Sequence, residues 1–155
     1  FNLHHVFARE LGADMGFLAW KDAGVNLYGN SIIANGPWLA ANKDKAEKFV
    51  KITQKAFAEC AKNPAPCVTA LVEANGALKY DNELDNWHLV TMLMNDETSR
   101  NVALGWHDDK RMASDYERVA EYLKMEKPYD VKTAYTNDFL DKNVKMPPIN
   151  PPKLY

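Results

Sequence analysis

The stretch WKDAGVNLYGNSIIANGPWLAANKDKAEKFVKITQKAF, at residues 20–57, decides the fold, because its periodicity changes part-way along. The apolar run at residues 31–34 contains adjacent β-branched residues, which is typical of a short buried strand. Pro37 suits the first position of a short helix through Asn42. Asp44 is then expected to cap a long amphipathic helix. The apolar face of that helix is expected to comprise Ala46, Phe49, Val50, Thr53, Phe57 and Cys60.

Outward from this stretch the chain is mostly helical. Helices are expected at residues 2–11, from Pro66 to Ala74, from Asp81 or Asn82 to Met94, and from Asp108 or Asp109 to Lys127, where Pro128 stops the last one. The tail at residues 143–155 is rich in proline and must be extended. The sequence predicts many helices and very few strands. This balance suits a chain whose helices cover a sheet, most of whose strands belong to another part of the protein. The expected fold class is therefore helix-rich α/β.

Composition and charge exclude several classes of protein. The 155 residues fit one ordinary domain or a large piece of a bigger protein, and 46% hydrophobic with 26% charged residues is typical of a globular chain. The net charge of −2 is spread along the chain, so no basic stripe for nucleic acid is present. The sequence contains no run of about 20 apolar residues, so it predicts no membrane-spanning helix.

The amino-terminal sequence FNLHH has neither a basic start nor an apolar stretch of the kind found in signal peptides. The chain also does not begin with Met. A processed product, a fragment and a partly read sequence are equally compatible with this start.

Cys60 and Cys67 lie in the stretch ECAKNPAPC, with two prolines between them. Such a turn can bring two cysteines to the separation of about 5.5 Å between Cα atoms that a disulfide needs. A disulfide would imply an oxidising compartment. Two buried free thiols beside a helix–helix turn are the alternative, because cysteine also packs as a small apolar residue.

No enzymatic or metal-binding motif stands out. The four histidines share no HxxxH or HxH spacing, and neighbours such as His4 and His5 point about 100° apart on a helix. The chain has no GxSxG, GxGxxG or phosphate-binding loop motif. We therefore expect no catalytic residues, no metal site and no cofactor.

Aromatic and short polar residues alternate between the glycines of the deciding stretch. Rings that cover an apolar face, with a few polar groups that fix orientation, are typical of small-ligand clefts. A surface loop in which Trp20 and Tyr28 plug the core is the alternative. The candidate ligand-binding residues are Trp20, Asp22, Asn26, Tyr28 and Asn30.

The same stretch resembles solute-binding proteins of the NMT1/THI5-like and aliphatic-sulfonate group. In these proteins a G-[VL]-x-[LY]-Y-G-N-x-[IV]-[IV]-A segment precedes W/F-L-x-x-N-x-[DE] and a long helix. Here the segment is Gly24–Ala34, followed by Trp38-Leu39 and Asn42-Lys43-Asp44. The later LGWHDDKRM and AYTNDFL are similar to that family's closing segments. The likeness covers about residues 12–142.

The resemblance implies the carboxy-terminal part of a type II periplasmic binding protein, in which two α/β lobes surround a ligand cleft. Residues 1–15 would end the second lobe, and residues 16–34 would cross back to the first lobe. Residues 35–142 would cover that first lobe with helices, and residues 143–155 would form the extended tail. An amino-terminal half of the same protein would complete the fold.

The resemblance further implies a solute-binding component of an ABC importer, not an enzyme. Its ligand would be a small organic nutrient such as a thiamine-precursor pyrimidine or a sulfonate. Trp20 would stack on the ligand, Asp22 would bind an amine or positive charge, and Tyr28 and Asn30 would form hydrogen bonds.

Its partner would be a membrane permease, and its location the periplasm of a Gram-negative cell or a lipid anchor outside the cell. Secretion favours the Cys60–Cys67 disulfide. A helical interaction fragment without a ligand, or the thiamine-pyrimidine synthesis found in the eukaryotic branch of the family, are the alternatives.

Overall fold

The computed structural model describes residues 7–8, 11–12, 15–16 and 18–149. The elements in this part are η2 (Trp20–Ala23), α2 (Gly36–Ala41), α3 (Lys43–Lys62), α4 (Pro64–Ala74), α5 (Tyr80–Met94), α6 (Glu97–Asn101), α7 (Asp109–Tyr122) and η3 (Val131–Thr133). The helix predicted at residues 2–11 falls mostly outside the described residues, as does the end of the tail. Across the described part, none of the helices combines the length and apolarity that crossing a bilayer requires.

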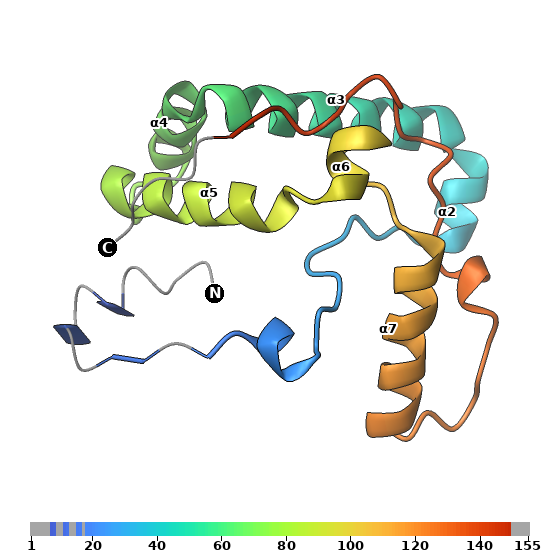
Figure 1. Cartoon of the computed structure of the whole chain (residues 1–155). Helices are drawn as coiled ribbons and strands as arrows, with labels where there is room; N and C mark the ends of the chain where they lie inside the picture. The colour runs from blue at the N-terminus through green and yellow to red at the C-terminus, as the bar shows by residue number, and fades with distance from the viewer. Residues whose placement is uncertain (1–6, 9–10, 13–14, 17, 150–155) are drawn as a thin grey trace.

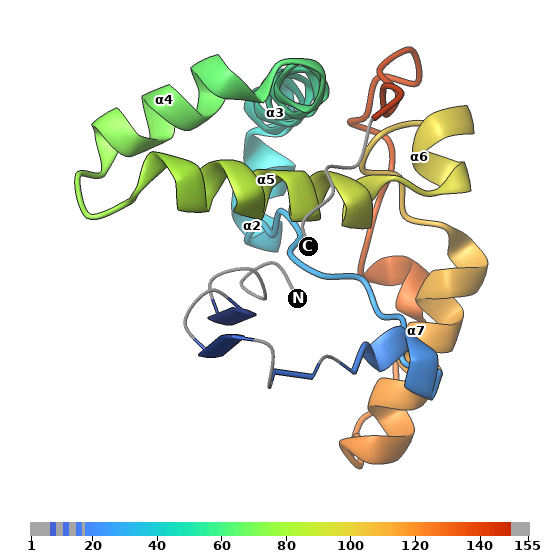
Figure 2. The same cartoon turned by 60° about the vertical axis from the view of Figure 1, so that its left-hand side comes forward.

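The helices form a body from which one helix projects. α4 packs on both α3 and α5, and α2 packs on the beginning of α3 (Figure 1). α7 runs crosswise to α3 and α5 and carries η3 along its side (Figures 1 and 2). An extended segment at residues 25–35 passes from η2 along the α7 end of the molecule to α2. This arrangement places the family-like stretch against α7.

Side-chain caps explain where several helices begin. Asn35 accepts a hydrogen bond from the backbone N–H of Trp38 at 3.1 Å and so caps α2. Asp96 and Ser99 form a reciprocal capping box at the start of α6. Asp108 caps α7 by accepting from the backbone N–H of Arg111 at 2.9 Å. The predicted start of α7 is confirmed, whereas α2 begins at Gly36, one residue before the predicted Pro37.

The core lies between α3 and the carboxy-terminal tail. Ala58, Leu104 and Met146 form a buried cluster, and partly buried apolar residues of α5 and the tail pack against it. Gln54 is also buried, and its amide nitrogen donates to the backbone oxygens of Leu104 at 2.9 Å and Asp141 at 3.0 Å. Its side-chain oxygen accepts from the backbone N–H of Asp141 at 2.9 Å. One buried amide therefore fastens the tail to α3.

The strand predicted at residues 31–34 is not observed among the described residues. The segment is extended but forms no ladder, and Ile32 and Ile33 are 56% and 90% exposed. A strand needs a neighbouring strand for its backbone hydrogen bonds, and no strand occurs among the residues that the structure describes. The helix-rich character is confirmed, whereas the sheet of the expected α/β class is not observed.

The predicted buried face of α3 was also misplaced. Asp44 lies within the first turn, because α3 begins at Lys43 and Asn42 occupies the cap position, two residues before the predicted cap. Gln54 and Ala58 are buried along with Ala46, whereas Phe49 is 59% exposed. The tail and the loop before α7 cover the Gln54 side of α3, which rotates the buried stripe away from Phe49.

Two further helix predictions need correction. α4 begins at Pro64 instead of Pro66, because Pro64 occupies the favourable first position directly after Asn63. α7 ends at Tyr122, five residues before the predicted end at Lys127, and Leu123, which was expected inside the helix, is 75% exposed. α7 has no fully buried residue because it packs mainly against η3 and the extended segment.

Candidate functional site

Tyr28, in the centre of the family-like stretch, lies against the start of α7. Its hydroxyl accepts a hydrogen bond from the backbone N–H of Asp108 at 2.8 Å and contacts the backbone oxygen of Trp106 at 3.5 Å. Its own backbone N–H donates to Asp115 Oδ2 at 2.9 Å. Burial raises the pKa of the Tyr28 hydroxyl. Both the hydroxyl and the backbone N–H of Tyr28 are thus engaged within the chain.

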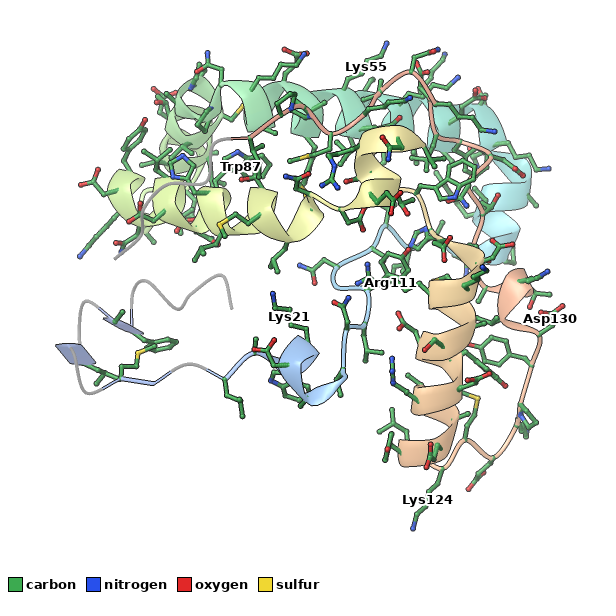
Figure 3. The ribbon with its side chains drawn as sticks, viewed as in Figure 1. Lys21, Lys55, Trp87, Arg111, Lys124 and Asp130 are labelled. Carbon is green, nitrogen blue, oxygen red and sulfur yellow. A yellow bond between two sulfur atoms is a disulfide. The ribbon has the colours of Figure 1, made fainter. Side chains whose placement is uncertain are left out.

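Arg111 covers the exposed side of Tyr28. Its guanidinium carbon lies 4.1 Å from the centre of the Tyr28 ring, a cation–π distance. The same group donates to the backbone oxygens of Asn26 and Leu27, both at 3.2 Å. A third contact, of 3.6 Å, pairs it with Asp96 Oδ2. Figure 3 shows Arg111 between the extended segment and α7.

His107 lies beside the Tyr28 ring. The two rings meet edge to face, with centres 5.1 Å apart, and the Tyr135 ring lies 5.7 Å from His107. Asn137 exchanges two hydrogen bonds of 2.9 Å with the backbone of His107. His107 Nδ1 is buried and has no hydrogen-bond partner within the described part of the chain. Burial lowers the pKa of this imidazole, which favours the neutral ring.

Tyr135 lies next to His107 in the same cluster. Its hydroxyl donates to Asp109 Oδ1 at 2.7 Å. This hydrogen bond to a carboxylate raises the pKa of Tyr135 to about 12. The cluster around Tyr28 therefore contains neutral rings, one guanidinium and several carboxylates, a composition that suits docking and recognition.

The five predicted ligand-binding residues fall in two places. Asn26 and Tyr28 meet at the α7 corner, whereas Trp20 and Asp22 lie on η2, and Asn30 is exposed on the extended segment. Trp20 is 76% exposed and lines an open apolar hollow of about 180 Å³. The structure therefore does not bring all five residues to one pocket.

A second hollow lies among α3, α4 and α5, with a volume of about 210 Å³. Cys60 and Cys67, the predicted pair, are joined by a disulfide in its wall, with Cα atoms 5.8 Å apart. Trp87 also lines it, and its indole N–H donates to the backbone oxygen of Cys60 at 2.9 Å (Figure 3). Within the described residues, no group of three or more potential metal ligands occurs here or elsewhere.

Sequence reasoning missed Arg111 and Asp115. One signal pointed to Arg111, because a cation in the first turn of a helix is disfavoured by the helix dipole and needs acceptors elsewhere. Asp108, Arg111 and Asp115 are also spaced three and four residues apart, which places them on one face of α7. The partner of that face was not readable, because Asn26–Tyr28 lie about 85 residues earlier in the chain.

The segment docked on this face can now be compared with known proteins. Residues 1–66 match the NMT1/THI5-like family. The resemblance drawn from the deciding stretch is thereby confirmed for this segment, which includes η2, the extended segment, α2 and α3. The NMT1/THI5-like family includes solute-binding proteins. No curated protein and no solved structure matches the chain. Arg111 and the rest of α7 lie outside the matched residues.

Proposed function

We propose that this chain is part of a solute-binding component of an ABC importer, which captures a small organic nutrient. The observation that carries the proposal is the family match over residues 1–66, which spans the exposed Trp20 and the docked Tyr28 segment. A thiamine-precursor pyrimidine or a sulfonate is the proposed class of ligand. Ligand binding between two lobes would stabilise a closed state by contacting both.

The surface around η2 supports a ligand-binding role. Trp20 stands beside an apolar hollow, where its ring can cover the face of a planar ligand. Asp22, two residues after Trp20 on η2, is also exposed, and its carboxylate can accept a hydrogen bond from an amine of the ligand. Asn30 is exposed on the extended segment, where its amide can form hydrogen bonds with a ligand.

Exposed apolar residues support further polypeptide of the same protein as a partner. Ile32 and Ile33 lie on an extended segment without a ladder, and Phe49 and Ile52 are exposed on α3. Clustered exposed apolar residues mark surfaces that other structure covers. We propose that strands of the two-lobed fold pair with residues 31–34 and that α3 covers the resulting sheet.

The disulfide supports an extracytoplasmic location. Disulfides persist in oxidising compartments such as the periplasm. We therefore propose a periplasmic protein or one held outside the cell by a lipid anchor, with a membrane permease as its second partner. Both cysteines of the chain are used in this disulfide.

Tryptophan fluorescence tests the proposal. The intact protein would be titrated with a hydroxymethyl aminopyrimidine and with short alkanesulfonates. We expect a saturable change in emission that is lost in Trp20→Phe and retained in Trp38→Phe, a matched control because Trp38 is also exposed. Traces that stay flat with every compound to millimolar concentration would overturn the proposal.

A helical interaction module without its own ligand is the second candidate. One observation favours it, namely that the hydroxyl and backbone N–H of Tyr28 are both engaged inside the chain. In that case Tyr28 docks the segment and contributes nothing to a ligand. Flat titrations together with a folded protein would favour this candidate over transport.

A further inference from the structure

Arg111 links its own helix to two other segments of the chain. It lies in the first turn of α7, reaches the backbone oxygens of Asn26 and Leu27, and pairs with Asp96 at the start of α6. Its side chain is only 28% exposed. A cation at this end of a helix is disfavoured by the dipole, so these contacts must offset that cost.

We propose that Arg111 is a positioning residue that fixes residues 26–28, and through them Trp20, on the corner between α6 and α7. The consequence for ligand capture rests on the function proposed above. The docking itself is independent of any ligand.

The contacts of Arg111 need a guanidinium. The planar group stacks on the Tyr28 ring while its edge donates to two carbonyl oxygens. A lysine ammonium is a compact charge on a flexible stem and cannot make the stacked and the forked contacts together. Lysine at this position is therefore expected to fail, although it keeps the charge.

Two other residues at the start of α7 and along it also hold Tyr28, and together with Arg111 we call them the clamp. Asp115 accepts from the Tyr28 backbone N–H, and the backbone N–H of Asp108 donates to the Tyr28 hydroxyl. The Arg111 guanidinium then closes over the ring that these bonds orient. Two amide protons, those of Tyr28 and Asp108, thus report whether the segment is docked.

A short hydrogen-bonded turn transmits the position to Trp20. Val25 donates its N–H to the Trp20 backbone oxygen at 2.9 Å, and Gly24 donates to that of Lys21 at 3.0 Å. Gly24 has φ +81°, a conformation that glycine adopts without strain. Because Asn26 follows this turn directly, fixing its carbonyl also restricts where the Trp20 ring stands.

Amide hydrogen exchange of the full chain tests the clamp. In Arg111→Gln we expect exchange at the Tyr28 and Asp108 amides to become roughly tenfold faster, the loss expected for charge-assisted hydrogen bonds. Amides of α3 and α5 should keep their wild-type rates. Arg111→Lys should resemble Arg111→Gln, whereas Arg118→Gln, two turns further along α7, should resemble wild type. Unchanged rates in Arg111→Gln, full rescue by Lys, or a uniform acceleration that includes α3 would each overturn the proposal.

Ligand titration separates the clamp from the transport function. If the wild-type protein binds one of the pyrimidine or sulfonate probes, Arg111→Gln should raise the dissociation constant several-fold while Arg118→Gln does not. Equal affinities with a selectively opened segment would overturn the positioning role for ligand. A selective exchange effect without any wild-type response to the probes would overturn the transport function and leave the clamp standing.

Discussion

The α3–α4–α5 corner and the docked segment at residues 25–28 are held by different kinds of contact. A disulfide joins α3 to α4, and the Trp87 indole donates to Cys60 while its ring packs edge to face against Phe57. The docked segment contains no cysteine and therefore no disulfide. Hydrogen bonds, a cation–π contact and an edge-to-face ring pair around Tyr28 hold it in place.

This difference separates global from local stability. Contacts inside the helical corner are lost only when the body unfolds, whereas a segment held by half-exposed polar contacts can open by itself. Ligand-binding segments are drawn from the parts that open easily. We therefore expect changes in the body to lower the free energy of unfolding and changes at the docked segment to act on exchange and ligand response.

The largest effect is expected at Gln54. Gln54→Leu removes the partners of the Leu104 and Asp141 carbonyls and of the Asp141 N–H, all near the core. Leaving such groups unsatisfied costs about 3 kcal/mol in total. Denaturant unfolding would measure the loss, with the exposed Lys48→Ala as the control. A loss as small as that of Lys48→Ala would show that the tail is not fastened by this amide.

The next largest effect concerns the disulfide. Replacing both Cys60 and Cys67 by alanine removes a short covalent loop, which costs roughly 2 kcal/mol through the unfolded chain. Reduction of the wild-type protein should lower its unfolding midpoint by a similar amount. Intact mass after alkylation checks the pairing, because two alkyl groups should add only after reduction. Addition of both groups without reduction would contradict the disulfide.

A smaller and local effect is expected at Tyr28. Tyr28→Phe keeps the ring beneath Arg111 but removes the acceptor of the Asp108 N–H, which costs about 1 kcal/mol. Exchange at the Asp108 amide should accelerate while the α5 amides remain protected. Tyr129→Phe is the matched control, since Tyr129 is exposed and lies at the far end of α7 against Tyr116. Equal loss of protection in α5 would place Tyr28 in the cooperative body instead.

The periodic parts of the sequence predicted the structure best. Apolar spacing and proline or Asp–Asn signals located α2, α5 and the start of α7 to within about two residues, because these features act over one helical turn. The short helix α6 was missed because a capping box without an apolar stripe carries a weak signal. The strand predicted at residues 31–34 is not observed, because a strand needs a neighbouring strand to pair with and apolar composition does not show whether one is present.

The candidate site was only half readable for a related reason. Asn26 and Tyr28 were identified from their local aromatic-polar pattern, but Arg111 and Asp115 meet them across more than 80 residues. Gln54 was likewise left out of the predicted buried face of α3, because its partners lie 50 to 87 residues away. Contacts at that separation follow from tertiary packing and leave no spacing pattern in one sequence.

The smallest effect, and the one that separates the two regions most directly, is a dependence on pH. Burial lowers the pKa of His107 in the docked corner and of His88 in α5. Each ring therefore binds a proton less readily when folded than when unfolded, so stability is complete above the unfolded value of about 6.5 and falls as the pH drops below it. Partial exposure limits each contribution to about 0.5 kcal/mol at pH 5.5.

Two variants separate the two regions. His107→Phe keeps a ring beside Tyr28, and it should abolish any acceleration of hydrogen exchange at the Tyr28 amide that acid causes. His88→Phe should instead flatten the pH dependence of global unfolding. If either variant changed both measurements equally, the two regions would open as one unit, and the distinction between body and docked segment would be lost.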